Sequence, residues 1–113
     1  MQDLKARTKK FALDFIRFCR TLPVGDEFQI IRRQLIRAAT GTASNYRAAQ
    51  RAKSKADFIS SPGDAEEEAD ESLFWLECLA DLATRESPDL KALLKEADEL
   101  VAILTSSRKT ARA

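Results

Sequence analysis

Hydrophobic residues recur every three or four positions along four segments of the chain, a spacing that places them on one face of an α-helix. Around residues 3–21 this face consists of Leu4, Phe11, Phe15, Phe18 and Leu22. Over residues 26–52 it consists of Phe28, Ile31, Leu35, Ala38, Thr42, Tyr46 and Ala49. Pro23 and Gly25 separate the two segments, because neither residue favours a helix interior.

The third segment covers residues 54–84, with Phe58, Ala65, Ala69, Leu73, Leu76, Leu79, Ala80 and Ala83 on its face. Pro62 and Gly63 interrupt this segment. Because Pro inside a helix costs about 3 kcal/mol, we predict a break or kink at residues 60–63. The pair Ser87-Pro88 then opens a fourth helix over residues 88–106, with Ser87 as its N-cap. Its hydrophobic face consists of Leu90, Leu94, Ala97, Val101 and Leu104.

Four amphipathic helices with short connections bury their hydrophobic faces most simply as an antiparallel up-down four-helix bundle. A chain of 113 residues is large enough for one core, so we predict a single all-α domain over residues 1–106. Residues 107–113 are small and polar, and we expect them to form a frayed tail. Gly41 lies among small residues of the second helix, which predicts close approach of another helix there.

The charges are divided unevenly along the chain. Residues 1–55 contain thirteen Lys or Arg and four Asp or Glu, whereas residues 56–113 contain six and fourteen, so the net charge of +1 hides a strong asymmetry. Such an arrangement governs the choice of partner more than the fold. It predicts a protein that binds something, including its own copies.

The second helix aligns four arginines opposite its hydrophobic face, at Arg33, Arg37, Arg47 and Arg51. Guanidinium groups pair with phosphate oxygens, so this ridge is a candidate nucleic-acid site. Lys53 and Lys55 are candidates to extend it, and whether they do depends on the fold. Whether Lys5, Lys9 and Lys10 also extend the ridge depends on the fold. The alternative is an ordinary solvated helix face.

The third helix has hydrophobic residues on two faces, and such a helix usually has two burial partners. Its second face combines aromatic and apolar residues with acids: Phe74, Trp75, Cys78, Leu82, Glu67 and Glu71. Aromatic residues are enriched at interface centres, so we predict that this face joins copies of the chain. The alternative is that the bundle rotates this helix or covers the face with residues 53–61. In a homo-oligomer the basic ridge of one copy can also meet the acidic face of the next and close a ring.

The sequence lacks the residues that most catalytic and metal sites need. It contains no His, no Gly-rich phosphate loop and no Cys/His pair, so we predict no enzyme, no cofactor, no metal and no small-molecule substrate. The longest uncharged run, Ala38–Tyr46, is far shorter than a membrane span, so no membrane association is expected. The N-terminus lacks the features of a secretory signal, and Cys19 and Cys78 fit reduced thiols, which together predict a cytoplasmic protein.

A family resemblance rests on the segments Gln34–Ala39, Asn45–Ala49, Arg51–Ile59, Glu68–Ser72 and Trp75–Glu77. Over roughly residues 1–105 the chain resembles the four-helix-bundle proteins encoded in intervening sequences of bacterial large-subunit (23S) ribosomal RNA genes. This resemblance implies a bundle that assembles as a homopentameric ring, with an unsettled molecular function. One departure is the sequence after Ile59, where the family continues with apolar residues and this chain has Ser60–Asp64.

The fold is also similar to the accessory variability determinant of diversity-generating retroelements, a basic pentamer that binds nucleic acid and a reverse transcriptase. That likeness implies Arg37, Arg47, Arg51, Lys53 and Lys55 as candidate contacts. We therefore expect a ring-forming scaffold that binds RNA or a ribonucleoprotein. The alternative is a protein-interaction module whose charged faces serve subunit or partner contacts only, and a third possibility is a regulatory partner of a neighbouring gene product.

Overall fold

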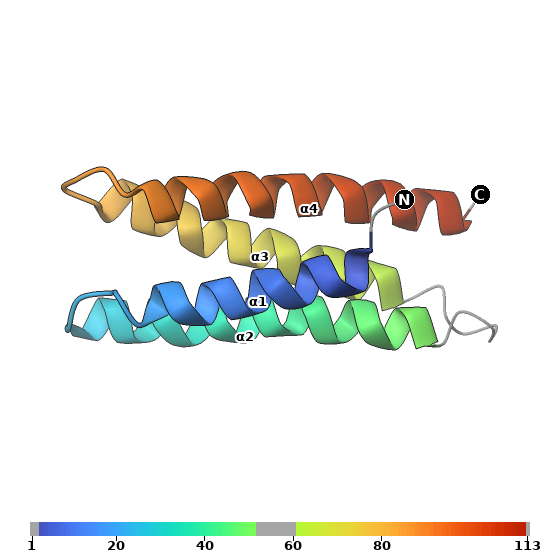
Figure 1. Ribbon diagram of the computed structural model, residues 1–113, viewed down its shortest axis with the longest axis horizontal. Coiled ribbons are helices and arrows are strands. Elements are labelled where there is room, and N and C mark those ends of the chain that lie inside the picture. Colours follow the sequence, from blue (N-terminus) through green and yellow to red (C-terminus); the bar gives the residue numbers. More distant parts are fainter. Residues whose placement is uncertain (1–2, 52–60, 113) are drawn as a thin grey trace.

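The computed structural model describes residues 3–51 and 61–112. These residues form four α-helices: α1 Leu4–Cys19, α2 Asp26–Arg51, α3 Ser61–Leu82 and α4 Pro88–Arg112. Each helix packs against its neighbour in sequence, and α1 also packs against α4, so α3 lies diagonally across from α1. The helices lie along one long axis, and the turns at residues 20–25 and 83–87 lie at the same end (Figure 1). The predicted all-α four-helix bundle is confirmed.

Local sequence explains where the helices begin and end. Asp3 caps α1 by accepting a hydrogen bond from the amide of Ala6 at 3.1 Å, and Ser87 caps α4 by accepting one from the amide of Leu90 at 3.2 Å. Gly25 has a φ of 150°, a conformation that favours glycine, just before α2. The N-cap predicted at Ser87 is therefore present.

The helix boundaries differ from the predicted ones at two places. Helix α3 begins at Ser61, with Pro62 in its first turn, where a helix needs no amide donor, while the predicted helical residues 54–60 lie outside the described residues. Helix α4 continues to Arg112 rather than ending near residue 106. No Gly or Pro interrupts residues 107–112, so no residue of this segment strongly disfavours a helix.

The core combines the predicted faces of the helices in two clusters of buried side chains. The larger cluster contains Phe11 and Phe15, whose ring centroids lie 4.3 Å apart, together with Leu35 and Leu76. The smaller one contains Ala65, Ala69 and Leu104. The buried hydroxyls of the core bond to carbonyl oxygens of their own helices, so they add no unpaired polar atom: these residues are Thr8, Thr42 and Ser72.

The hydrophobic face of α4 is rotated relative to the predicted one. Leu93 and Leu100 are buried, whereas the predicted Leu94 and Val101 are only half-buried. Two alanines predicted for the core face of the third helix are exposed: Ala80, in the last turn of α3, and Ala83, just after its end. Alanine occurs at the surface as well as in the core, so the spacing of these alanines did not determine whether they are buried or exposed.

Candidate nucleic-acid and subunit interfaces

The arginine ridge of α2 divides into two parts in the structure. Arg33, Arg47 and Arg51 are exposed and pair with no acidic side chain within residues 3–51 and 61–112. Lys53 and Lys55, predicted to extend the ridge, lie outside the described residues. Three guanidinium groups on one helix face therefore remain available to an anionic partner.

Arg37 is the fourth arginine of the predicted ridge, and it turns toward α3. Its Nη1 lies 3.5 Å from Oε2 of Glu68, and its Nη2 donates a hydrogen bond to Oε1 of Glu71. The same guanidinium donates to Oε1 of Gln34 at 3.1 and 3.2 Å. Arg37 thus joins α2 to α3 and, although its side chain is 53 % exposed, it differs from the other three in having acidic partners.

Glu68 reaches Arg37 because α2 has no side chain at Gly41. A Cβ at Gly41 would lie 2.6 Å from Oε2 of Glu68, a separation that real Cβ atoms do not adopt. Burial against α2 raises the pKa of Glu68, an effect that the nearby charge of Arg37 partly offsets. The predicted close approach at Gly41 is thus a carboxylate of α3 lying over the helix.

Helix α1 contributes cations to the same face as the three free arginines. At one end of the helix pair, Nε of Arg32 donates to the carbonyl oxygen of Cys19 at 3.1 Å. At the other end, burial and then the negative charge of Asp3 raise the pKa of Tyr46, so Asp3 lies near Tyr46. The antiparallel register between these two anchors fixes which residues of α1 and α2 lie at the same level.

This register places three exposed cations beside the arginines of α2: Lys5 and Lys9 of α1 and Arg20 at its C-cap. Lys5, Lys9 and Arg20 are four and eleven residues apart, close to whole numbers of helical turns, so they share one side of α1. Lys10 lies off that side, because its Nζ bonds Oδ2 of Asp14 at 2.6 Å on the side toward α4. We define the basic strip by its exposed members: Lys5, Lys9, Arg20, Arg33, Arg47 and Arg51.

The acidic residues of α1 and α2 lie away from the middle of the basic strip. Asp14 forms salt bridges with Lys10 and Arg17, and its Oδ1 lies 3.2 Å from Nη1 of Arg17. It borders a hollow between α1 and α4. Asp26 and Glu27 occupy the first turn of α2, where they suit the positive end of the helix dipole. The strip therefore keeps a single sign of charge over most of its length.

A second candidate surface lies on the α2–α3 side of the bundle. Phe74 and Leu82 of α3 are each 53 % exposed, and Ile30 of α2 is 58 % exposed. Since Arg37 meets Glu71, the antiparallel register places Ile30 level with Cys78, two turns further along both helices. We define the apolar stripe as Ile30, Phe74, Cys78 and Leu82.

The remaining residues predicted for the subunit interface have different surroundings. Trp75 is half-buried and packs against the larger core cluster, with its Nε1 buried and without a hydrogen-bond partner in the described structure. Its ring lies edge to face with Phe74, with the centroids 5.1 Å apart. Glu67 is exposed, whereas Glu71 is half-buried and bonded to Arg37. Trp75 therefore supports the stripe from below rather than forming part of it.

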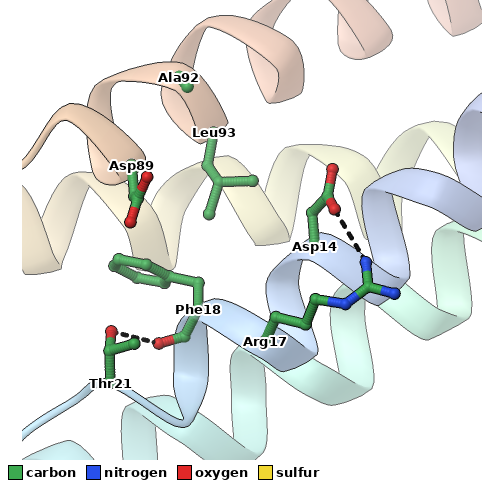
Figure 2. A pocket seen from close by; sticks show the side chains of 7 residues that line it. All are labelled: Asp14, Arg17, Phe18, Thr21, Asp89, Ala92 and Leu93. Atoms are coloured by element: carbon green, nitrogen blue, oxygen red, sulfur yellow. Dashed lines mark hydrogen bonds and ion pairs between the residues drawn. The ribbon is translucent and has the colours of Figure 1, made fainter.

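A hollow of about 370 Å³ lies between the end of α1 and the start of α4. Figure 2 shows Asp14 and Arg17 paired at one side of it, with Phe18 and Leu93 between them and Asp89. Its other lining residues are Thr21 and Ala92. The hydroxyl of Thr21 donates to the carbonyl oxygen of Phe18, so it turns to its own helix end rather than into the hollow. The arrangement contains neither a nucleophile with a base nor a set of convergent ligands.

Metal-binding and membrane-spanning features are absent from the described residues. Among them, no group of three or more His, Cys, Asp or Glu side chains is placed to hold a metal ion. None of their helices combines the length and hydrophobicity needed to cross a lipid bilayer.

Residues 2–106 match the family described as 23S rRNA-intervening sequence proteins. The chain belongs to this family. Among solved structures, it is similar to a protein of unknown function of the S23 ribosomal protein family from Bacteroides thetaiotaomicron VPI-5482. The two are 27 % identical, the similarity covers 93 % of this chain and 97 % of the other, and the TM-score is 0.81. No curated protein matches the chain.

In this 23S rRNA-intervening sequence protein, the sequence left open whether the lysines of α1 extend the arginine ridge, and it gave no indication of Arg20. Lys5 and Lys9 were named, but only the pairing of α1 with α2 separates them from Lys10. Ile30 was missed as well, because a single apolar residue on a polar helix face is common. Ile30 becomes part of a candidate interface only because the packing of α2 against α3 places it level with Cys78.

Proposed function

We propose that the protein is a non-enzymatic, cytoplasmic helical scaffold that binds structured RNA, alone or within a ribonucleoprotein, through the basic strip. The observation that carries the proposal is the exposure of Arg33, Arg47 and Arg51 without acidic partners, while the neighbouring Arg37 is held by α3. Phosphates provide the bidentate acceptors that such guanidinium groups lack within the chain.

A filter-binding titration with fragments of ribosomal RNA across a salt series tests this proposal. Wild-type protein should bind at about 50 mM salt and weaken steeply as salt increases, because phosphate contacts release counterions. The double variant Arg47→Gln, Arg51→Gln should bind at least about ten-fold more weakly. Arg17→Gln is the control, because Arg17 pairs with Asp14 away from the strip. Lack of wild-type binding, or affinity that does not depend on salt, would contradict the proposal.

We also propose that copies of the chain associate through the apolar stripe, and the family resemblance makes a pentamer the expected assembly. Three large side chains that are more than half exposed support this proposal. The stripe lies on the α2–α3 side and the basic strip on the α1–α2 side, so self-association leaves the strip accessible. The sequence allowed the same arginines to bind either nucleic acid or another copy of the chain. With association through the apolar stripe, the two kinds of contact use different sides of the bundle.

Light scattering tests the association. Wild-type protein should have a mass near five times 12.7 kDa, and Phe74→Ser should lower the mass toward that of a monomer. Leu13→Ser is the matched control, since Leu13 is 40 % exposed on α1. An unchanged mass for Phe74→Ser would refute the stripe as the interface. If Arg47→Glu with Arg51→Glu disrupts assembly instead of RNA binding, the charged face serves subunit contacts.

A further inference from the structure

The basic strip is formed by two helices and not by one. Lys5 and Lys9 of α1 and the C-cap residue Arg20 form one row. The three arginines of α2 form the other row, and the hydrogen bond that Arg32 donates to the carbonyl oxygen of Cys19 fixes the register between them. Packed helices have axes about 8–10 Å apart, so the strip consists of two parallel rows of cations. From Arg33 to Arg51 the α2 row covers about 27 Å at 1.5 Å per residue.

The strip has no exposed aromatic side chain in the described residues. Phe74, which is exposed, lies on α3 in the apolar stripe. Phe28 and Tyr46 of α2 are half-buried and pack against the core clusters. Proteins that bind single-stranded nucleic acid stack its bases on aromatic rings, and each stacked base contributes about 1–3 kcal/mol. The strip therefore offers cations for phosphates without a surface for unpaired bases.

From these two observations we infer that the basic strip binds double-stranded segments of RNA, by spanning the two phosphate strands that border a groove of the duplex. This inference rests on the proposed RNA binding and names its substrate class. The A-form duplex has a narrow major groove with closely spaced phosphate strands, and proteins recognise it by shape and phosphate contacts. Two cation rows fixed on packed helices suit such a pair of strands, because neither row must reorganise to reach its phosphates.

The inference assigns a role to Lys5 and Lys9 that the arginine ridge alone does not require. If one phosphate strand contacts α2, the other contacts α1, and both rows contribute to affinity. Each phosphate contact adds about 0.9 to the slope of log affinity against log salt for a duplex. Removing Lys5 and Lys9 should therefore reduce the magnitude of that slope by nearly 2.

Fluorescence anisotropy with a labelled 20-base-pair RNA duplex and its two separated strands, chosen to lack self-pairing, tests the inference. We expect the full-length protein to bind the duplex at least about ten-fold more tightly than either strand, because only the duplex engages both rows. Equal or tighter binding of the single strands overturns the inference and the preference for structured RNA, but leaves RNA binding through the basic strip intact. Binding of neither form at about 50 mM salt overturns both.

The double variant Lys5→Gln, Lys9→Gln tests the α1 row. It should weaken duplex binding and reduce the salt slope, whereas Lys10→Gln with Lys91→Gln should change neither. This control removes the same charge, but Lys10 pairs with Asp14 and Lys91 with Glu86 away from the strip. If Arg47 and Arg51 prove necessary but Lys5 and Lys9 do not, binding is confined to α2 and the inference fails. A change of oligomeric mass in the Lys5, Lys9 variant shows that a second copy occupies the strip, and also overturns it.

Discussion

The carboxylate of Glu68 on α3 lies over Gly41 of α2, where a Cβ atom would be only 2.6 Å from its Oε2. This position brings the carboxylate to Arg37, and the side chain of Glu68 is only 22 % exposed there. A glycine inside a helix costs about 1 kcal/mol relative to alanine. The glycine therefore gives up helix stability and makes room for an ionic contact between α2 and α3.

The effect of Gly41→Ala on the free energy of unfolding should depend on whether residue 68 is glutamate or alanine. In the wild-type background the gain in helix propensity is offset because the new Cβ displaces Glu68 from Arg37, so the free energy of unfolding should change little. In a Glu68→Ala background the same substitution should stabilise by up to about 1 kcal/mol. Urea unfolding of the four proteins measures both effects. Gln50→Ala, exposed near the end of α2, should have equal effects in both backgrounds.

The raised pKa of Glu68 makes stability depend on pH. Burial favours the protonated carboxyl in the folded protein, so stability from this group is present at low pH and is lost as pH rises through the folded pKa. From about pH 4 to 7, wild type should therefore lose stability relative to Glu68→Gln. In an Arg37→Met background the loss should be larger, because the charge of Arg37 lowers this pKa. A wild type that gains stability with pH relative to Glu68→Gln would show that the ion pair outweighs burial.

Arg7 joins α1 to α4 by a forked contact with Glu96. Its Nε and Nη2 donate to the two carboxylate oxygens at 2.8 and 2.6 Å, and this contact raises the pKa of Arg7. Arg7→Met should lower the free energy of unfolding by about 1 kcal/mol, and Arg7→Lys by less, since lysine keeps the charge without the fork. Arg17→Met, at an exposed pair, should cost under about 0.5 kcal/mol in the same denaturation assay. Equal costs for the two methionine variants would contradict the special role of the fork.

The two cysteines should differ in reactivity. Burial raises the pKa of the Cys19 thiol to about 11, with a smaller opposing effect from Arg32, whereas Cys78 is half-buried at the surface. Alkylation at pH 8 should label Cys19 only after unfolding, because the thiolate is the reactive form. Cys78 should be labelled without denaturant in the Phe74→Ser variant, where no second copy is expected to cover the apolar stripe. Mass spectrometry of Cys78→Ser before and after denaturant provides the check. Rapid native labelling of Cys19 would show that this end of the bundle opens readily.

The periodicity of hydrophobic residues predicted the fold because large apolar side chains are stable only on the side of a helix that faces the core. Phe11, Phe15 and Leu35 lie where their spacing indicated, in the core. Where side chains are small or several leucines adjoin, the pattern allows more than one rotation, and so Leu93 and Leu100 were missed on α4. The spacing of residues within one helix does not show which neighbouring helix each side packs against.

The candidate sites were predictable only as far as single helices determine them. Arg37 shares a face of α2 with Arg33 and Arg51, but its partner acids are over thirty positions away in sequence, on α3. The separation of Lys9 from Lys10 likewise depends on which helix packs on each side of α1. Pairing between helices decides which charges remain free, and a single sequence does not contain that register.

The diagonal placement of α1 and α3 has a consequence for how the molecule behaves on charged supports. Helix α3 contains acidic residues and no Lys or Arg, and the basic strip occupies the α1–α2 side. A nearly neutral protein with charges separated in this way should be retained by both cation- and anion-exchange resins at low salt. It should adsorb with opposite sides of the bundle facing the two resins, and neighbouring molecules should be least soluble where salt is too dilute to screen their dipoles.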